Sequence, residues 1–285
     1  MNADADEVAI TGLHAYPVKS CAGVGLGEVL LIETGFEFDR TWMLVDTDGE
    51  FVSQRELPRM ALVRPELRHS EMVLRAPGML PLHLALDTVE APTRVRVWDD
   101  VVAAYDMGAL AAQWFSDFLR QALRLVRFDP EHRRLSSRAW TGPHEAENAF
   151  SDGFPLLVIS EASLAGLNDR LAARGAAPVT MARFRPNLVL SGLDAHGEDF
   201  LDEIAFDTPD GPVRLKLVKP CPRCPIPNVD PDTAEAGTEP GDTLSAYRAD
   251  ARVGGALSFG MNAIVVEGLE CSLRVGQTGR ATLKF

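Results

Sequence analysis

Residues 213–224 read VRLKLVKPCPRC, in which apolar and basic residues alternate before a pair of cysteines. An apolar residue at every second position predicts a strand over Val213–Val218 that buries one of its faces. Pro225 and Pro227 follow the second cysteine, and two prolines at alternate positions exclude a regular helix there. We therefore expect a strand that leads into a rigid, extended loop bearing two thiols.

Short apolar segments of the strand type recur along the chain, separated by turn signals such as Asp48-Gly49. The predicted strands cover Val29–Ile32, Trp42–Val45, Val95–Trp98, Pro155–Ile159, Leu188–Leu190, Ala263–Val266 and Ser272–Val275. Helical spacing of apolar residues predicts one helix over 109–123 and a second that Ser160 caps and Gly175 ends. We expect an α+β, β-rich fold of β-barrels with a few helices, rather than a doubly wound sheet.

Length and composition limit the class of protein. A chain of 285 residues corresponds to one large domain or two. The polar segment 127–150 is the best boundary, between a unit 6–126 and a unit 127–285. With 46% hydrophobic residues, the chain has enough apolar material to fold. A net charge of −13 argues against binding to nucleic acid or to an anionic membrane surface.

The sequence also indicates a compartment. No apolar run approaches the roughly 20 residues that span a bilayer, and residues 1–6 lack the basic region of a signal peptide. Four cysteines are too few for a disulfide scaffold. We therefore expect a cytoplasmic protein that does not associate with a membrane.

The pair Cys221 and Cys224 is compatible with few known uses of two nearby cysteines. A thioredoxin-type pair needs its first cysteine at a helix N-terminus, and a c-type haem site needs a histidine where Pro225 stands. The sequence lacks the three clustered cysteines of an iron–sulfur site. A zinc site built from scattered ligands stays open, as do ordinary loop cysteines. The remaining interpretation is a single activated thiolate on the loop. Arg223 stands beside Cys224 and would favour the thiolate form, and a thiolate is a suitable ligand for a soft or high-valent metal.

Several polar residues near predicted strand ends indicate an anion-binding site. Lys19 and Ser20 lie between a strand and a Gly-containing turn and could donate hydrogen bonds to a phosphate, although no P-loop pattern is present. Arg40 begins an apolar strand, and Arg185 and Asn187 directly precede another. Taken alone, Lys19 is better explained as a surface lysine and Arg40 as the partner of Asp39. Arg185 is explained equally well by a structural ion pair. Together with the thiolate, they suit a phosphorylated organic cofactor that carries a metal.

The order of these motifs resembles that of the MOSC family, in its two-domain form with an MOSC N-terminal β-barrel. The resemblance covers nearly the whole chain, and many matches in order are more specific than any one of them. The matching segments are Tyr16–Cys21, Asp39–Asp46, Gln54–Glu56, Ser160–Leu164, Phe184–Asn187, Cys221–Cys224, Val229–Thr233, Tyr247–Arg248 and Phe259–Gly260. The resemblance implies an MOSC N-terminal domain over residues 6–126 and an MOSC domain over residues 127–285.

The resemblance implies a molybdenum cofactor, a pterin dithiolene with one phosphate, and gives the matching residues their roles. Cys224 would be the thiolate ligand of molybdenum and the catalytic residue, whereas Cys221 would not bind the metal. The phosphate side would be held by Lys19, Ser20 and Arg40. The pterin side would be held by Arg185, Asn187, Arg223 and the backbone of Cys221 and Pro222, with further contacts from Asp152, Gly153, Phe154 and Asn262.

The implied activity is that of a molybdenum-cofactor oxidoreductase of the amidoxime-reducing type. Such an enzyme would reduce small N-hydroxylated or N-oxygenated compounds by oxygen-atom transfer at a Cys-ligated molybdenum. Relatives carry a membrane anchor or a ferredoxin domain, and neither is expected here. Electrons would therefore come from a separate protein, such as a ferredoxin, a flavodoxin or a cytochrome b5-like protein with its reductase.

One segment departs from the family pattern, and other functions stay open. Pro225–Asn228 replaces the more usual residues beside the metal, which leaves the identity of the substrate open. One alternative is a non-catalytic MOSC module that binds or carries the cofactor, or carries sulfur as a persulfide on Cys224. Another is a β-barrel protein that retains no cofactor.

Overall fold

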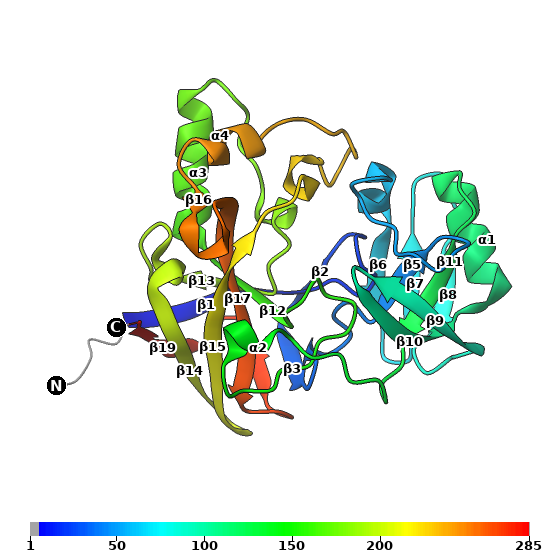
Figure 1. The fold of residues 1–285 in the computed structure, drawn as a ribbon, viewed down its shortest axis with the longest axis horizontal. Coiled ribbons are helices and arrows are strands. Elements are labelled where there is room, and N and C mark those ends of the chain that lie inside the picture. The colour runs from blue at the N-terminus through cyan, green and yellow to red at the C-terminus, as the bar shows by residue number, and fades with distance from the viewer. Residues whose placement is uncertain (1–5, 285) are drawn as a thin grey trace.

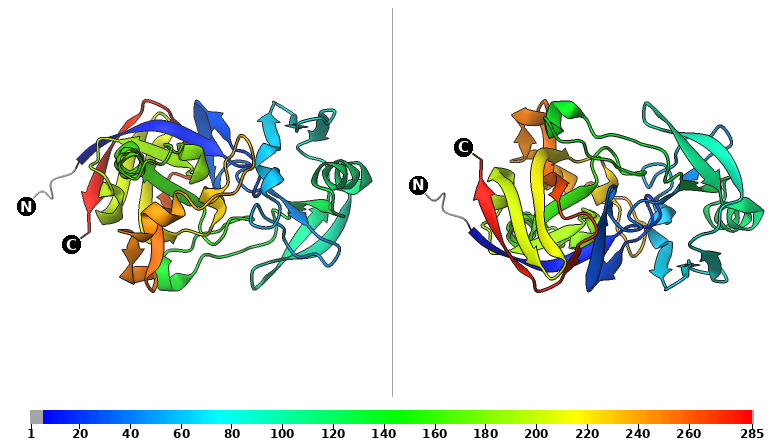
Figure 2. Two further views of the ribbon diagram at one scale, coloured as in Figure 1. Left: turned by 90° about the horizontal axis from the view of Figure 1, so that it is seen from above. Right: turned by 90° about the horizontal axis from the view of Figure 1, so that it is seen from below.

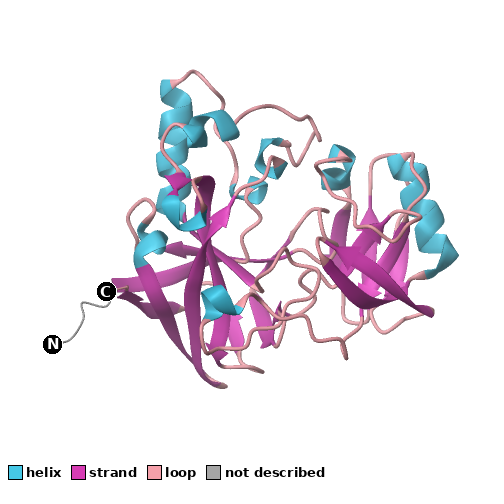
Figure 3. Ribbon diagram, viewed as in Figure 1, coloured by secondary structure: helices cyan, strands magenta, loops and turns pink. Residues whose placement is uncertain are grey.

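Strands form most of the regular structure in the computed structural model, which describes residues 6–284 (Figure 1). Strand residues make up 41% and helical residues 19% of the chain (Figure 3). The predicted fold class, β-rich α+β with barrels and few helices, is confirmed. Within the described range, no helix combines the length and apolar character that crossing a membrane requires.

Seven strands between residues 6 and 284 close into a barrel, because the last one pairs back with the first. All neighbouring strands are antiparallel except the first two, which run parallel. In order around the barrel, the strands are β12 (Leu156–Ser160), β13 (Leu188–Ser191), β1 (Asp6–Ala15), β19 (Thr278–Leu283), β14 (Leu201–Thr208), β15 (Gly211–Pro222) and β17 (Ala256–Glu267). The first and last strands of the chain, β1 and β19, therefore lie side by side (Figure 2).

Apolar residues with strand periodicity fill the barrel. Val213, Leu215 and Leu217 of β15 are fully buried, as the alternating pattern predicts. Gly260 lets β17 approach β12, because a Cβ at this position would lie only 2.5 Å from Ile159 Cγ1. Outside the barrel, α3 (Glu161–Ala173) packs its leucines against an aromatic layer.

The N-terminal part contains two smaller sheets and one long helix. One sheet has the order β5 (Trp42–Val45), β11 (Arg124–Phe128), β10 (Asp100–Asp106) and β9 (Ala91–Val97). The other joins β6 (Arg64–Leu67), β7 (Glu71–Arg75) and β8 (Leu82–Ala85). The helix α1 (Gly108–Leu119) buries Trp114, Phe115 and Phe118 against these sheets.

Residues 6–36 belong in space with the C-terminal half of the chain. The strand β1 completes the barrel, and β2 (Val24–Leu26) pairs with β1. A separate small sheet joins β18 (Ser272–Arg274) to β3 (Glu28–Ile32) and β4 (Gly35–Phe36). The division into units 6–126 and 127–285 stays a prediction, and the two halves of the sequence share one apolar core.

The predicted strands are all present, and the predicted helices differ only at their ends. The helix predicted over 109–123 ends at Leu119, because Arg120 takes a left-handed conformation with φ of 61°. The segment 231–245 contains the short helix α4 (Gly241–Ser245), which the sequence analysis did not predict. Short elements complete the fold: α2 (Arg138–Thr141), β16 (Ala249–Asp250) and 3-10 turns at Pro58–Leu62, Met181–Arg183, Gly197–Phe200, Ile226–Asn228 and Ala251–Val253.

Candidate functional site

A cavity of about 670 Å³ lies between the N-terminal sheets and the barrel. Its walls come from the N-terminal loops, from the connecting segment 127–155 and from β15 and β17. Every residue to which the sequence assigned a site role lines this cavity: Lys19, Ser20, Arg40, Asp152, Gly153, Phe154, Arg185, Asn187, Cys221, Pro222, Arg223, Cys224 and Asn262. The fold thus collects into one place residues that are up to 243 positions apart in the sequence.

The two thiols lie at the end of β15, as the alternating pattern and the prolines predict. Both are free and partly buried. Arg223 donates a hydrogen bond from Nη1 to the sulfur of Cys221 at 3.1 Å and one from Nη2 to the carbonyl of Phe184 at 2.8 Å. The guanidinium of Arg223 thus turns back to the other thiol, and the expectation that it favours a thiolate at Cys224 stays a prediction. Within residues 6–284, no hydrogen bond reaches the sulfur of Cys224, which faces the cavity.

Two guanidinium groups lie close to the phenol of Tyr16 on one side of the cavity. The guanidinium carbons of Arg40 and Arg185 lie 4.4 and 4.3 Å from the ring centroid. Arg40 also bonds Asp39 at 2.5 Å, and donates to the side-chain oxygen of Asn187 at 3.0 Å. Burial raises the pKa of Tyr16 to about 12, so its hydroxyl stays protonated. Burial and the neighbouring Arg40 lower the pKa of Arg185 to about 10, which leaves it charged at neutral pH.

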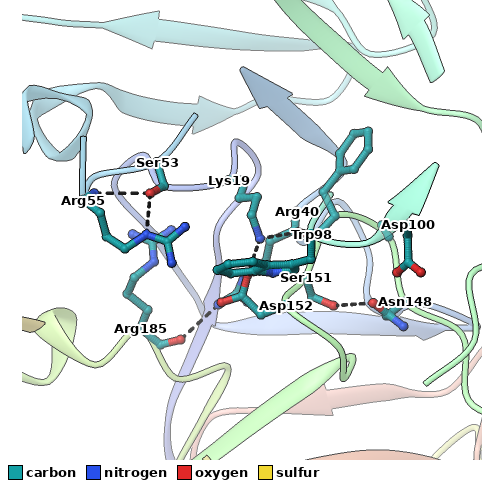
Figure 4. A network of polar contacts seen from close by, with 12 residues as sticks. Lys19, Arg40, Ser53, Arg55, Trp98, Asp100, Asn148, Ser151, Asp152 and Arg185 are labelled. Atoms are coloured by element: carbon teal, nitrogen blue, oxygen red, sulfur yellow. Dashed lines mark hydrogen bonds and ion pairs between the residues drawn. The ribbon is translucent and has the colours of Figure 1, made fainter. Parts of the chain in front are cut away.

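Lys19 and Asp152 form an ion pair at another part of the wall (Figure 4). The ammonium of Lys19 lies 2.5 Å from Asp152 Oδ1 and 2.7 Å from the carbonyl of Phe150. Burial acts to raise the pKa of the Asp152 carboxyl, but the ammonium overcomes this effect and holds that pKa below its ordinary value. Burial lowers the pKa of Lys19, and Asp152 partly offsets the change. The indole of Trp98 donates to the same carboxylate at 3.2 Å.

Arg134 joins the connecting segment to the cavity wall. Its side chain is only 6% exposed. The guanidinium donates to Asp100 at 2.7 Å, to the side chain of Asn148 at 2.6 Å and to the carbonyl of Ser151 at 2.6 Å. This one buried guanidinium thereby fixes Ser151, which precedes Asp152, and Asp100, which lies two residues after Trp98.

Four of the nine non-glycine residues with positive φ in the described part of the chain line this cavity. They are Ser20, Arg40, Trp98 and Arg185, with φ of 66°, 49°, 55° and 59°. This conformation costs free energy for residues that carry a Cβ, and such positions concentrate at functional sites. The concentration of these residues at one cavity makes it the candidate functional site.

The structure also adds cavity residues that the sequence analysis did not identify. The most prominent are Phe51, Arg55, Trp98, Arg134 and Lys219. Arg55 belongs to one of the matching family segments, which was a usable signal. Trp98 and Arg134 gave no such signal, because they reach the cavity only through the folding of a turn and of the connecting segment.

No group of three or more His, Cys, Asp or Glu side chains in residues 6–284 is arranged to hold a metal ion. A zinc site built from scattered ligands therefore has no support in this part of the chain. A single thiolate that binds a metal already held by an organic cofactor needs no such group. The cavity offers the thiols of Cys221 and Cys224 together with cations and hydrogen-bond donors.

Comparison with known proteins gives two domain matches and a set of relatives. The MOSC N-terminal beta barrel domain matches residues 7–122, and the MOSC domain matches residues 145–279. Mitochondrial amidoxime reducing component 2 of Rattus norvegicus is 37% identical over 254 residues, covering 84% of this chain and 72% of that protein. Mitochondrial amidoxime-reducing component 1 of Homo sapiens is 36% identical over 255 residues, with the same coverage.

Proposed function

This chain belongs to the MOSC family, in the two-domain form of the amidoxime-reducing components. We propose that it is a molybdenum-cofactor oxidoreductase that reduces small N-hydroxylated compounds. The observation that carries the proposal is the cavity in which the unpartnered thiol of Cys224 meets the cationic residues of both halves of the chain. The names of the relatives supply the reaction class.

The residues present fit such a cofactor. The cavity volume of about 670 Å³ is suited to a compact organic cofactor with a substrate beside it. The sulfur of Cys224 is a soft donor, and molybdenum is a metal that thiolates bind well. The Nε of Arg223 is buried and has no hydrogen-bond partner in the described structure, so it can serve a bound heterocycle. Seven cationic side chains against three carboxylates among the described lining residues favour a phosphorylated ligand.

The chain's own residues would bind and orient the cofactor, which supplies two-electron redox chemistry when bound. Cys224 would hold the metal. Lys19, Ser20 and Arg40 would hold the phosphate. Arg185, Asn187 and Arg223, with the backbone of Cys221 and Pro222, would hold the pterin, and Asp152, Gly153, Phe154 and Asn262 would add further contacts.

Several of these groups are already fixed by other parts of the protein. The side chain of Asn187 accepts hydrogen bonds from Arg40 and from the amide of Leu157, and donates to the carbonyl of His14. Besides its contact with the pterin, it would therefore set the position of Arg40. Such preorganisation lowers the entropy lost when the cofactor binds.

The overall reaction is balanced by an external reductant. Converting an N–OH group into N–H and water requires two electrons and two protons. We assign the electrons to a separate donor protein, such as a ferredoxin, a flavodoxin or a cytochrome b5-like protein with its reductase. The substrate is a small molecule that enters the cavity beside Cys224.

The proposal is tested by reduction of benzamidoxime with an artificial reductant. The protein is made in a host that produces molybdenum cofactor, together with Cys224→Ser and Cys271→Ser. Cys271 is a buried thiol of the barrel core and is the control. We expect turnover by the wild type and by Cys271→Ser, and none by Cys224→Ser. A molybdenum-loaded wild type without turnover would contradict the substrate class, and a persulfide on Cys224 without molybdenum would favour a sulfur carrier.

A further inference from the structure

Lys219 lies on the cavity wall and has no role in the proposed cofactor site. It stands near the end of β15, where the pairing with β17 is irregular on both sides of it. Such β-bulges redirect side chains next to functional sites. Its ammonium lies 5.2 Å from the ring centroid of Trp140 and 5.6 Å from that of Phe154.

The ammonium of Lys219 has no anionic partner within residues 6–284. No carboxylate lies within 4.0 Å of it, and its nitrogen takes part in no hydrogen bond with the protein. In contrast, Lys19 pairs with Asp152, and Lys216 on the same strand pairs with Asp202 and Glu203. A partly buried ammonium held between two aromatic rings and facing a cavity is a site prepared for an anion.

Lys219 has other side-chain partners than Lys19, which belongs to the proposed phosphate side of the cofactor. Lys19 contacts Phe51 and Asp152, whereas Lys219 contacts Trp140 and Phe154. The carboxylate that pairs with Lys19 therefore does not neutralise Lys219. The aromatic faces next to Lys219 also limit the access of water, which strengthens a charge pair formed there.

We propose that Lys219 binds a carboxylate or similar anionic group of the substrate, so that the preferred substrates are anionic N-hydroxylated compounds. This inference rests on the proposed function and narrows its substrate class. The ring of Phe154 lines the cavity and would border both this molecule and the cofactor. Lys219 is thus a residue that determines specificity and takes no part in the redox step.

A matched pair of substrates tests the proposal with the molybdenum-loaded enzyme. Benzamidoxime and 4-carboxybenzamidoxime differ by one carboxylate. For the wild type, we expect the carboxylate to lower KM about tenfold, the size of one charge-assisted hydrogen bond. In Lys219→Met the ratio of the two KM values should fall to about one, and Lys219→Arg should restore most of it. Lys216→Met, on the same strand but paired at the surface, is the control and should keep the wild-type ratio.

A second readout does not depend on turnover. The chain has four lysines, so acetylation of each can be followed by mass spectrometry. We expect 4-carboxybenzamidoxime, but not benzamidoxime, to protect Lys219 from acetic anhydride, while Lys216 reacts equally with either compound. Absence of this protection would overturn the proposal.

The remaining outcomes separate the possible failures. Loss of molybdenum from Lys219→Met would show that the ammonium binds the phosphate of the cofactor, which overturns the substrate assignment. Equal KM ratios in the wild type and Lys219→Met would overturn the inference and leave the proposed function standing. Absence of turnover with either compound, together with protection of Lys219, would contradict the proposed function and retain the anion site.

Discussion

At the scale of single residues, one buried guanidinium connects the two halves of the cavity. Arg134 bonds the turn at Asp100, the side chain of Asn148 and the carbonyl of Ser151. The carbonyl of Ser151 loses its donor if the guanidinium is removed, Asn148 loses one of its two, and unsatisfied buried polar groups are costly. The stability of the wall around Asp152 therefore depends on this residue.

Replacing Arg134 tests this dependence. We expect Arg134→Met to lower the free energy of unfolding by about 3 kcal/mol, because several buried acceptors lose a charged donor. The control is Arg133→Met, which removes a 60% exposed side chain that pairs with Glu145 and Glu147. That change should cost less than about 1 kcal/mol. Urea unfolding measures both, and equal losses would contradict the role given to Arg134.

A second residue predicts how stability depends on pH. Burial, with the nearby Arg248 and Arg170, lowers the pKa of His196 from 6.5 to about 4. Between these values the unfolded chain binds the proton and the folded protein does not, so stability falls as pH falls. Relative to His196→Asn, the wild type should lose about 1–2 kcal/mol between pH 6.5 and 4, because solvent screening at this partly exposed side chain reduces the effect of the shift. Asparagine tolerates the left-handed conformation at this position, where φ is 65°.

The readout is the difference between the two unfolding curves, measured in urea at each pH. Glu198 is also buried, and burial raises the pKa of its carboxyl, so it contributes a slope of opposite sign in both proteins. A difference that stays constant from pH 6.5 to 4 would show that His196 does not titrate as described.

Residue types and positions predicted one part of the cavity residues, and the family resemblance supplied the rest, such as Asp152, Phe154 and Asn262. Cys224, Arg40 and Arg185 could be predicted as site residues because each is a charged or reactive residue next to a predicted strand. The direction in which a side chain points could not be predicted. Arg223 is next to Cys224 in the sequence, and yet its guanidinium contacts Cys221. Lys219 was also missed, because a lysine at the end of an alternating strand looks like part of its solvent face.

At the scale of elements, α3 begins where the sequence indicates. Ser160 has extended backbone angles and its hydroxyl accepts a hydrogen bond from the amide of Ser163 at 3.1 Å. This is the expected geometry of an N-cap. The hydroxyl of Ser163 in turn donates to the buried carboxyl of Glu198. The start of α3 is therefore fixed both by a cap and by a buried polar network.

Two serines at helix starts provide a matched test of this capping. Ser160→Ala removes the cap of α3 and should cost about 1–2 kcal/mol of unfolding free energy. Ser137 precedes α2 in the same way, but its side chain makes no capping hydrogen bond. Ser137→Ala should therefore change stability by less than about 0.5 kcal/mol. Thermal unfolding distinguishes the two, and an equal effect would contradict the assigned cap.

The strands were predictable one by one, but their partners were not. Alternation of apolar residues predicts β15 from local sequence, since the pattern itself decides which face is buried. In contrast, β1 pairs with β13 and with β19, which lie far away in the sequence. No local pattern contains this information, because such pairing depends on closure of the whole barrel. The end of α1 at a left-handed arginine was missed for a related reason, as arginine gives no sequence signal for that conformation.

At the scale of the whole molecule, the barrel is not built from one continuous part of the sequence. The first strand of the chain completes a barrel whose other strands all come from residues 156–283. We therefore predict that a fragment of residues 127–285 lacks a cooperative thermal unfolding transition, whereas the full chain has one. Circular dichroism measures both. A sharp transition in the fragment would show that β1 is dispensable for the barrel.

The distribution of charge also becomes clear only for the whole molecule. The net charge of −13 argues against polyanionic partners, and the cavity nevertheless carries more cations than carboxylates. An acidic chain around a cationic cavity favours a small phosphorylated ligand over a nucleic acid. The composition thus argues against nucleic acids as partners, whereas the fold shows the cavity at which the cationic side chains gather.

The molybdenum content per chain tests the central claim most directly. Elemental analysis is made on the wild type, Cys224→Ala and Cys221→Ser, all from a host that makes molybdenum cofactor. We predict about one molybdenum per chain in the wild type and in Cys221→Ser, since serine keeps an acceptor for Arg223, and almost none in Cys224→Ala. Equal molybdenum in the wild type and Cys224→Ala, or none in the wild type, would contradict the assignment of Cys224 as the residue that holds the metal.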